Sequence, residues 1–149
     1  MTDPRRRAEK ARRRAVSIPS LAVVTAAITL SIPIWLPIAV VVDVVRLRWR
    51  LPVVRLLVMA VCWGWIECIG VLRAFGLWLR GRAGDEGANY ALMSWWAGAL
   101  MSAMRTTSGR DPRIEGADQL EGGDAIVLSR HASFGDSLLS GWALATESG

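Results

Sequence analysis

The sequence predicts an α/β protein: membrane-associated helices at the N-terminus, followed by the first, incomplete part of an α/β domain. Three observations lead to this prediction. Two long apolar runs occupy residues 15–42 and 56–79, and a helical pattern follows at 86–105. A short strand-like run at 125–128 then precedes a helix-like stretch at 136–145. Strand, loop and helix in this order are typical of an α/β unit.

The composition favours a membrane environment. Hydrophobic residues make up 52% of the 149 positions, which is high for a soluble domain. The chain has eight tryptophans but only one tyrosine and two phenylalanines, and tryptophan favours the membrane–water interface. Cys62 and Cys68 lie six positions apart, on different faces of a helix, and no Cys/His spacing fits a metal site. We therefore expect no metal and no disulfide between these cysteines.

Residues 1–14 form a basic arm that we expect to be disordered. Seven of the arm's residues are positively charged: Arg5, Arg6, Arg7, Lys10, Arg12, Arg13 and Arg14. Such an arm next to an apolar run favours binding to anionic lipid headgroups. A nucleic-acid partner is not expected, because no aromatic residues are interleaved with these charges. A signal peptide is also disfavoured, since no small-residue cleavage site follows.

Residues 15–42 carry no charge and exceed the ~20 residues that a spanning helix needs. Pro33 and Pro37 interrupt the run, and each removes an amide donor. They are compatible with a bent spanning helix or with a hairpin that enters and leaves on one side. Asp43 ends the run, and a second basic cluster follows at Arg46, Arg48 and Arg50. Because positive residues favour the cytoplasmic side, the two clusters favour the hairpin over the straight span.

The second apolar run, 56–79, contains Glu67 and Arg73. A charge at mid-membrane costs about 3 kcal/mol on insertion scales. We therefore favour a helix lying partly in the interface, with these charges toward water or headgroups; a substrate or ion path is the alternative. Residues 15–80 together form the expected membrane-anchoring region.

Residues 81–149 form the expected first part of the α/β domain. A break at 81–85 precedes a helix at 86–105, which Asp85 and Glu86 begin and Arg105 ends, as the helix dipole favours. Its stripe of apolar side chains indicates core packing, and a wall for an acyl chain is the alternative. The stripe comprises Leu92, Met93, Trp96, Ala97, Leu100, Met101 and Met104. Loop residues at 106–113 and a short strand at 114–116 come next.

His131, the only histidine in the chain, lies five residues before Asp136. The histidine follows the expected strand, and the aspartate begins the expected helix. An imidazole that titrates near neutral pH beside a carboxylate that can orient it is the combination needed for a general base. A packed or surface histidine is the alternative that these residues alone leave open.

The segment 114–136 resembles the first block of the glycerolipid acyltransferases, which include the 1-acylglycerol-3-phosphate acyltransferases. The family signature is H-x4-D after a hydrophobic strand, often N-H-x-S-x-x-D, and His131, Ser133 and Asp136 match it. Arg130 stands where asparagine is common. The resemblance covers residues 110–145, and the later E-G-T-R-like block is not found. We therefore expect an N-terminal fragment of a longer enzyme that is inactive alone.

The resemblance implies acyl transfer from acyl-CoA or acyl-carrier protein to a lysophospholipid hydroxyl, in phospholipid biosynthesis. His131 would act as the base and Asp136 would orient and stabilise it, while Ser133 is expected to be a turn or cap residue. The partners implied are membrane lipids, the acyl donor as a substrate rather than a cofactor, and the lysophospholipid acceptor. The expected location is the cell membrane, with the catalytic part on its cytoplasmic face. A non-enzymatic membrane anchor or assembly protein remains the alternative.

Overall fold

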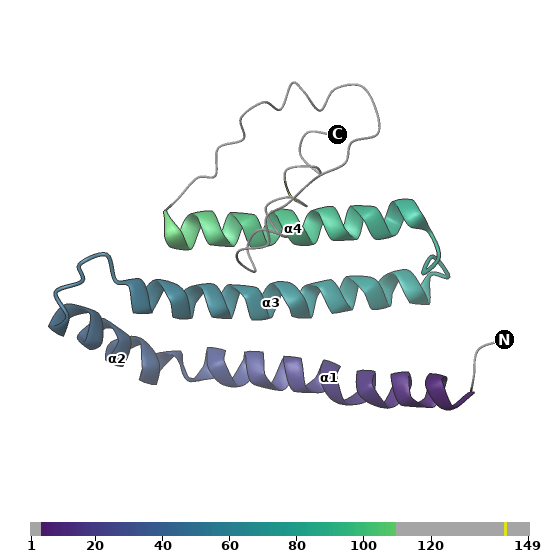
Figure 1. Cartoon of the computed structure of the whole chain (residues 1–149), viewed down its shortest axis with the longest axis horizontal. Coiled ribbons are helices and arrows are strands. Elements are labelled where there is room, and N and C mark those ends of the chain that lie inside the picture. The colour runs from purple at the N-terminus through teal and green to yellow at the C-terminus, as the bar shows by residue number, and fades with distance from the viewer. Residues whose placement is uncertain (1–3, 110–141, 143–149) are drawn as a thin grey trace, which may run out of the picture. The chain divides into compact units, whose positions relative to one another are not determined.

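The computed structural model describes residues 4–109 and 142. This part holds four helices: α1 (Pro4–Leu30), α2 (Ile32–Val45), α3 (Pro52–Leu79) and α4 (Glu86–Ser108) (Figure 1). The chain divides into two compact units, residues 1–72 and 73–149. Helix α3 therefore begins in the first unit and ends in the second.

The α/β prediction is wrong. The structure is 86% helical, and its described residues form no strand. The physical reason is that long apolar runs without alternation of polar and apolar residues satisfy their backbone groups within the run, as helices. The strands expected at 114–116 and 125–128 and the helix expected at 136–145 lie outside the described residues.

The first apolar run bends but does not reverse. Helix α1 begins at Pro4 and so includes most of the arm that was expected to be disordered. It ends at Leu30, and Pro33 lies in the first turn of α2. Both helices run in the same direction, and within the first unit the chain turns back at residues 46–51 (Figure 1). The hairpin expected within 15–42 is therefore not found.

At the break between α1 and α2, two side chains donate hydrogen bonds to one backbone carbonyl. Trp35 Nε1 donates to the Ile28 carbonyl oxygen at 2.9 Å, and Ser31 Oγ donates to the same oxygen at 2.9 Å. Ile28 lies in the last turn of α1, where carbonyls lack an amide partner within the helix, so these two side chains supply the donors. The bend is thus a hydrogen-bonded feature of the fold.

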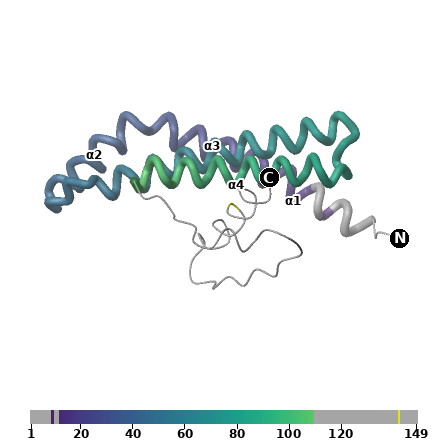
Figure 2. The backbone as a smooth tube through the Cα atoms, turned by 90° about the horizontal axis from the view of Figure 1, so that it is seen from above, coloured from purple at the N-terminus to yellow at the C-terminus, as the bar shows by residue number. Residues whose placement is uncertain are grey.

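Helix α3 lies antiparallel to α1 and α2 within the first unit, as Figures 1 and 2 agree. We call α1, α2 and residues 52–72 the hairpin, and residues 46–51 its tip. Thr25 is 5% exposed, and a Cβ built on Gly64 would lie 2.7 Å from Thr25 Oγ1. Trp65 Nε1 donates to Thr29 Oγ1 at 3.0 Å. Close approach at a small residue, joined by an interhelical hydrogen bond, is how helices associate in membranes.

Two helices are long and apolar enough to cross a membrane: Arg12–Leu30, within α1, and Pro52–Leu79. Helix α3 contains no buried residue. Many of the large apolar side chains of both helices are exposed, among them Val23, Leu30, Leu56 and Leu72. An apolar exposed surface of this extent is typical of contact with a membrane or another apolar partner.

In the second unit, the helix expected at 86–105 is confirmed as α4. Asp85 caps its first turn and Arg105 lies in its last. Gly109 ends it in the left-handed conformation, with φ of 66°. The expected stripe holds the three buried residues of this helix: Ala97, Leu100 and Met101.

Candidate functional site

The residues that carry the predicted chemistry, His131, Ser133 and Asp136, lie outside the described residues. Arg130 and the resembling segment 114–136 lie there as well. Among the residues that the structure does describe, no group of three or more His, Cys, Asp or Glu side chains could hold a metal ion. The described residues with charged side chains, which lie in the helical region, are therefore the remaining candidates for a functional site.

Glu67 and Arg73, the two charges inside the second apolar run, each contact a tryptophan. Trp63 Nε1 donates to Glu67 Oε1 at 2.9 Å, one helical turn away. The Arg73 guanidinium lies 3.9 Å from the centre of the Trp95 ring, in the second unit. Cation–π contact of this kind partly compensates a charge that leaves water. No pattern in the sequence predicts the Trp95 contact, because Arg73 and Trp95 belong to different helices.

Asp43 is the most buried charged residue that the structure describes. Its side chain is fully buried, although it lies at the end of an exposed helix. Its Oδ2 atom accepts hydrogen bonds from the amides of Val53 at 3.0 Å and Val54 at 3.2 Å, and Oδ1 lies 3.3 Å from the Val53 amide. These are free N–H groups of the first turn of α3. Asp43 therefore caps α3 from α2, across the tip.

The need for this distant cap follows from the residues at the start of α3. Leu51 precedes the helix and has no side-chain oxygen with which to cap it. Pro52 has no amide hydrogen, which makes it well suited to the first helical position. The first two amides that need an acceptor are thus those that Asp43 binds. In the sequence Asp43 marks only the end of the apolar run, and no local pattern reveals its capping role.

The tip ends α2 with an ordered turn. Leu47 N–H donates to the Val44 carbonyl and Arg48 N–H to the Asp43 carbonyl, both at 2.9 Å. This pair of bonds is a Schellman motif, which requires a left-handed residue at its centre. Leu47 fills that position with φ of 54°, and Leu51 is also left-handed, with φ of 48°. Leucine at such a position is uncommon, because its Cβ approaches the following carbonyl oxygen.

All five residues from Arg46 to Arg50 are exposed. No ion pair joins Arg46, Arg48 or Arg50 to another residue in the part of the chain that the structure describes. Trp49 is 77% exposed and Leu47 is 75% exposed. The tip therefore presents three guanidinium groups and two apolar side chains on a hydrogen-bonded turn.

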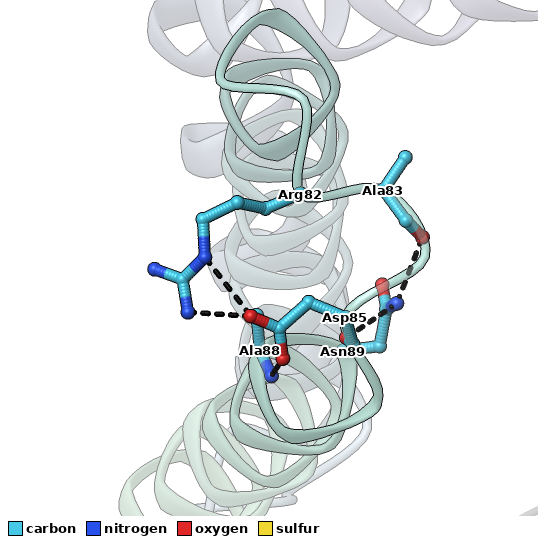
Figure 3. Close-up of polar contacts among 5 residues, drawn as sticks. All are labelled: Arg82, Ala83, Asp85, Ala88 and Asn89. Carbon is cyan, nitrogen blue, oxygen red and sulfur yellow. Dashed lines mark hydrogen bonds and ion pairs between the residues drawn. The ribbon is translucent and has the colours of Figure 1, made fainter.

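The turn between α3 and α4 is also closed by charged groups (Figure 3). Asp85 Oδ1 accepts from the Ala88 amide at 3.0 Å, and Oδ2 accepts from Arg82 Nε at 2.9 Å and Nη2 at 2.6 Å. Asn89 Nδ2 donates to the carbonyls of Ala83 at 3.0 Å and Asp85 at 2.9 Å. The Ala88 amide first, and the Arg82 guanidinium next, hold the pKa of Asp85 below its usual value.

An apolar pocket of about 320 Å³ lies between α1 and α3 in the hairpin. Its lining is almost entirely hydrocarbon, as expected of space between two apolar helices. It is lined by Leu21, Val24, Thr25, Ile28, Ala60, Val61, Trp63 and Gly64.

Comparison with known proteins identifies no relative. No protein-family model matches the chain, and neither the curated proteins nor the solved structures include a match.

Proposed function

We propose that this chain carries the membrane-attached catalytic base of an acyltransferase that acylates a lysophospholipid. The observation that carries the proposal is the string from His131 to Asp136, which matches the H-x4-D signature of the glycerolipid acyltransferases. Two membrane-length helices upstream support it, because an acceptor lipid resides in the bilayer. His131 is the only histidine of the chain, so the role of base has one candidate.

The reaction needs no covalent enzyme intermediate. His131 takes the proton of the lysophospholipid hydroxyl as the hydroxyl oxygen attacks the thioester carbonyl of acyl-CoA or acyl-carrier protein. The carbon–sulfur bond then breaks, and the imidazolium returns the proton to the leaving thiolate. Asp136 holds the imidazole tautomer and stabilises the imidazolium between these two steps. The products are the diacylated lipid and the free thiol.

The catalytic part is proposed to lie on the cytoplasmic face of the cell membrane. The arm carries seven positive charges, and such a cluster favours the cytoplasm.

The test measures transfer of a labelled acyl group from acyl-CoA to lysophosphatidate, in membranes that contain the whole protein. His131→Ala should lower the rate by 100-fold or more, within the range of about 10²–10⁴ that a general base contributes. Asp136→Asn should lower the rate strongly with a smaller effect on substrate binding. Ser133→Ala is the matched control inside the motif and should retain substantial activity. Full activity of His131→Ala would refute the assignment, and an acyl-Ser133 adduct would replace direct transfer by a covalent route.

A non-enzymatic membrane anchor is the second candidate. It is favoured by one observation: the four helices occupy nearly all described residues, and two of them suit a membrane. In that case the whole protein would remain membrane-bound, and none of the three variants would change any acyl transfer. The assay above therefore separates the two functions.

A further inference from the structure

We propose that the tip of the hairpin, residues 46–51, is a binding site for the phosphate headgroups of anionic phospholipids. The inference rests on the membrane attachment proposed above and is independent of acyl transfer. The site lies at the end of the hairpin opposite to the start of α1 (Figure 1).

The first argument is the charge balance of the tip. Arg46, Arg48 and Arg50 lie within five positions and are all exposed. The nearest acidic residue in sequence is Asp43, whose carboxylate is fully buried on the amides of Val53 and Val54. The aspartate that could neutralise this cluster is thus occupied by the start of α3, and the arginines remain available to an external anion.

The second argument is where the hairpin ends. Helix α3 has 28 residues and is about 42 Å long, close to the full bilayer thickness of about 40–45 Å. Its first residue follows the tip directly. Three arginines at mid-membrane would each cost about 3 kcal/mol on insertion scales, so the tip belongs at a headgroup layer. A hairpin of this length that enters a membrane therefore has its tip among phospholipid headgroups.

The third argument is the pairing of arginine with an interfacial aromatic. Trp49 stands between two of the arginines and is 77% exposed. Tryptophan is enriched at the depth of the headgroups. Guanidinium groups form two parallel hydrogen bonds with phosphate oxygens, which selects phosphate over other groups at that depth. The Schellman turn and the Asp43 cap hold these side chains on a fixed backbone.

These arguments identify the partner as the headgroup of an anionic phospholipid. Each basic residue near an anionic surface strengthens binding by about fivefold, so three give a preference on the order of 100-fold. Such a preference would draw anionic lipid to the tip and fix the depth and tilt of the hairpin.

The experiment places a fluorescent bimane on Val45→Cys, next to the tip, in the full chain with Cys62→Ser and Cys68→Ser. The protein is reconstituted into phosphatidylcholine vesicles that contain brominated phosphatidylglycerol or, at the same mole fraction, brominated phosphatidylcholine. Bromine quenches bimane only at close range, so the ratio of the two quenching values reports local enrichment of the anionic lipid. We expect a ratio well above one, which falls as salt is added.

Replacing Arg46, Arg48 and Arg50 by glutamine should bring the ratio to about one. The matched control replaces Arg12, Arg13 and Arg14 by glutamine at the other end of the hairpin, and should leave the ratio at the tip unchanged. Equal quenching by both lipids in the unchanged tip would overturn the proposal. So would an equal loss in the two triple variants, because the preference would then reflect net charge alone.

Carbonate extraction of the same vesicles separates this inference from membrane attachment. Release of the chain into the soluble fraction would refute the attachment itself. A chain that stays in the membrane without enrichment at the tip would refute only the headgroup site.

Discussion

Removal of the Asp43 side chain should open the start of α3. The carboxylate is fully buried and accepts hydrogen bonds from the amides of Val53 and Val54. Loss of a capping side chain costs about 1 kcal/mol. An amide left without an acceptor costs about 1–3 kcal/mol when it is buried. Val53 and Val54 are half-buried, so we take the lower value of about 1 kcal/mol for each. Asp43→Ala should therefore destabilise the start of α3 by about 2–3 kcal/mol.

Amide hydrogen exchange at residues 53–56 measures this effect directly. An opening that is easier by about 2–3 kcal/mol raises the exchange rate by roughly 30- to 150-fold. Asp43→Asn keeps one acceptor oxygen and should raise the rate less. Glu86→Gln, a change of the same kind at the exposed first turn of α4, should leave residues 53–56 unaffected. Unchanged exchange in Asp43→Ala would show that water or lipid caps these amides equally well, and the reasoning would fail.

Three further predictions concern the turns and the helix contact. Leu47→Gly should stabilise the tip by up to about 1 kcal/mol, because φ is 54° at this position and glycine adopts it without strain. Gly81→Leu, at the corresponding turn after α3 with φ of 69°, should destabilise that turn by a similar amount. Thermal unfolding in micelles measures both changes. Gly64→Ala should be less stable than Gly76→Ala by about 1–3 kcal/mol in the same assay, because a Cβ at 64 meets a neighbour at 2.7 Å and one at 76 meets none within 4 Å. The lowered pKa of Asp85 means that its stabilising contribution is complete above its usual pKa of 3.8 and is lost as the pH falls through its value in the folded protein. Protection at the start of α4, which is the exchange rate relative to the intrinsic rate at the same pH, should therefore fall in acid, and Asp85→Asn should remove that dependence.

The sequence alone determined the local elements of the membrane region. The apolar run at 56–79 and the break at 81–85 correspond to α3 and to the turn that follows it. The caps and the apolar stripe of 86–105 predicted α4; three of the seven stripe residues are buried, whereas Met93 is exposed. These features depend on neighbours within a few positions, which any reader of the chain can see. The α/β prediction is wrong because it rests on one expected strand–helix pattern near residue 130, whereas the described part of the chain is helical.

Only the tertiary structure decided where the chain reverses and which partners Asp43 and Arg73 contact. Pro33 and Pro37 were equally compatible with a bend and a reversal, because proline removes a hydrogen bond in both cases. The structure shows a bend at these prolines. The chain reverses instead at 46–51, where the Asp43 carboxylate accepts hydrogen bonds from amides ten and eleven positions away. The contact of Arg73 with Trp95 likewise joins two helices. Partners so far apart in sequence meet only through packing, and no periodicity within one helix specifies them.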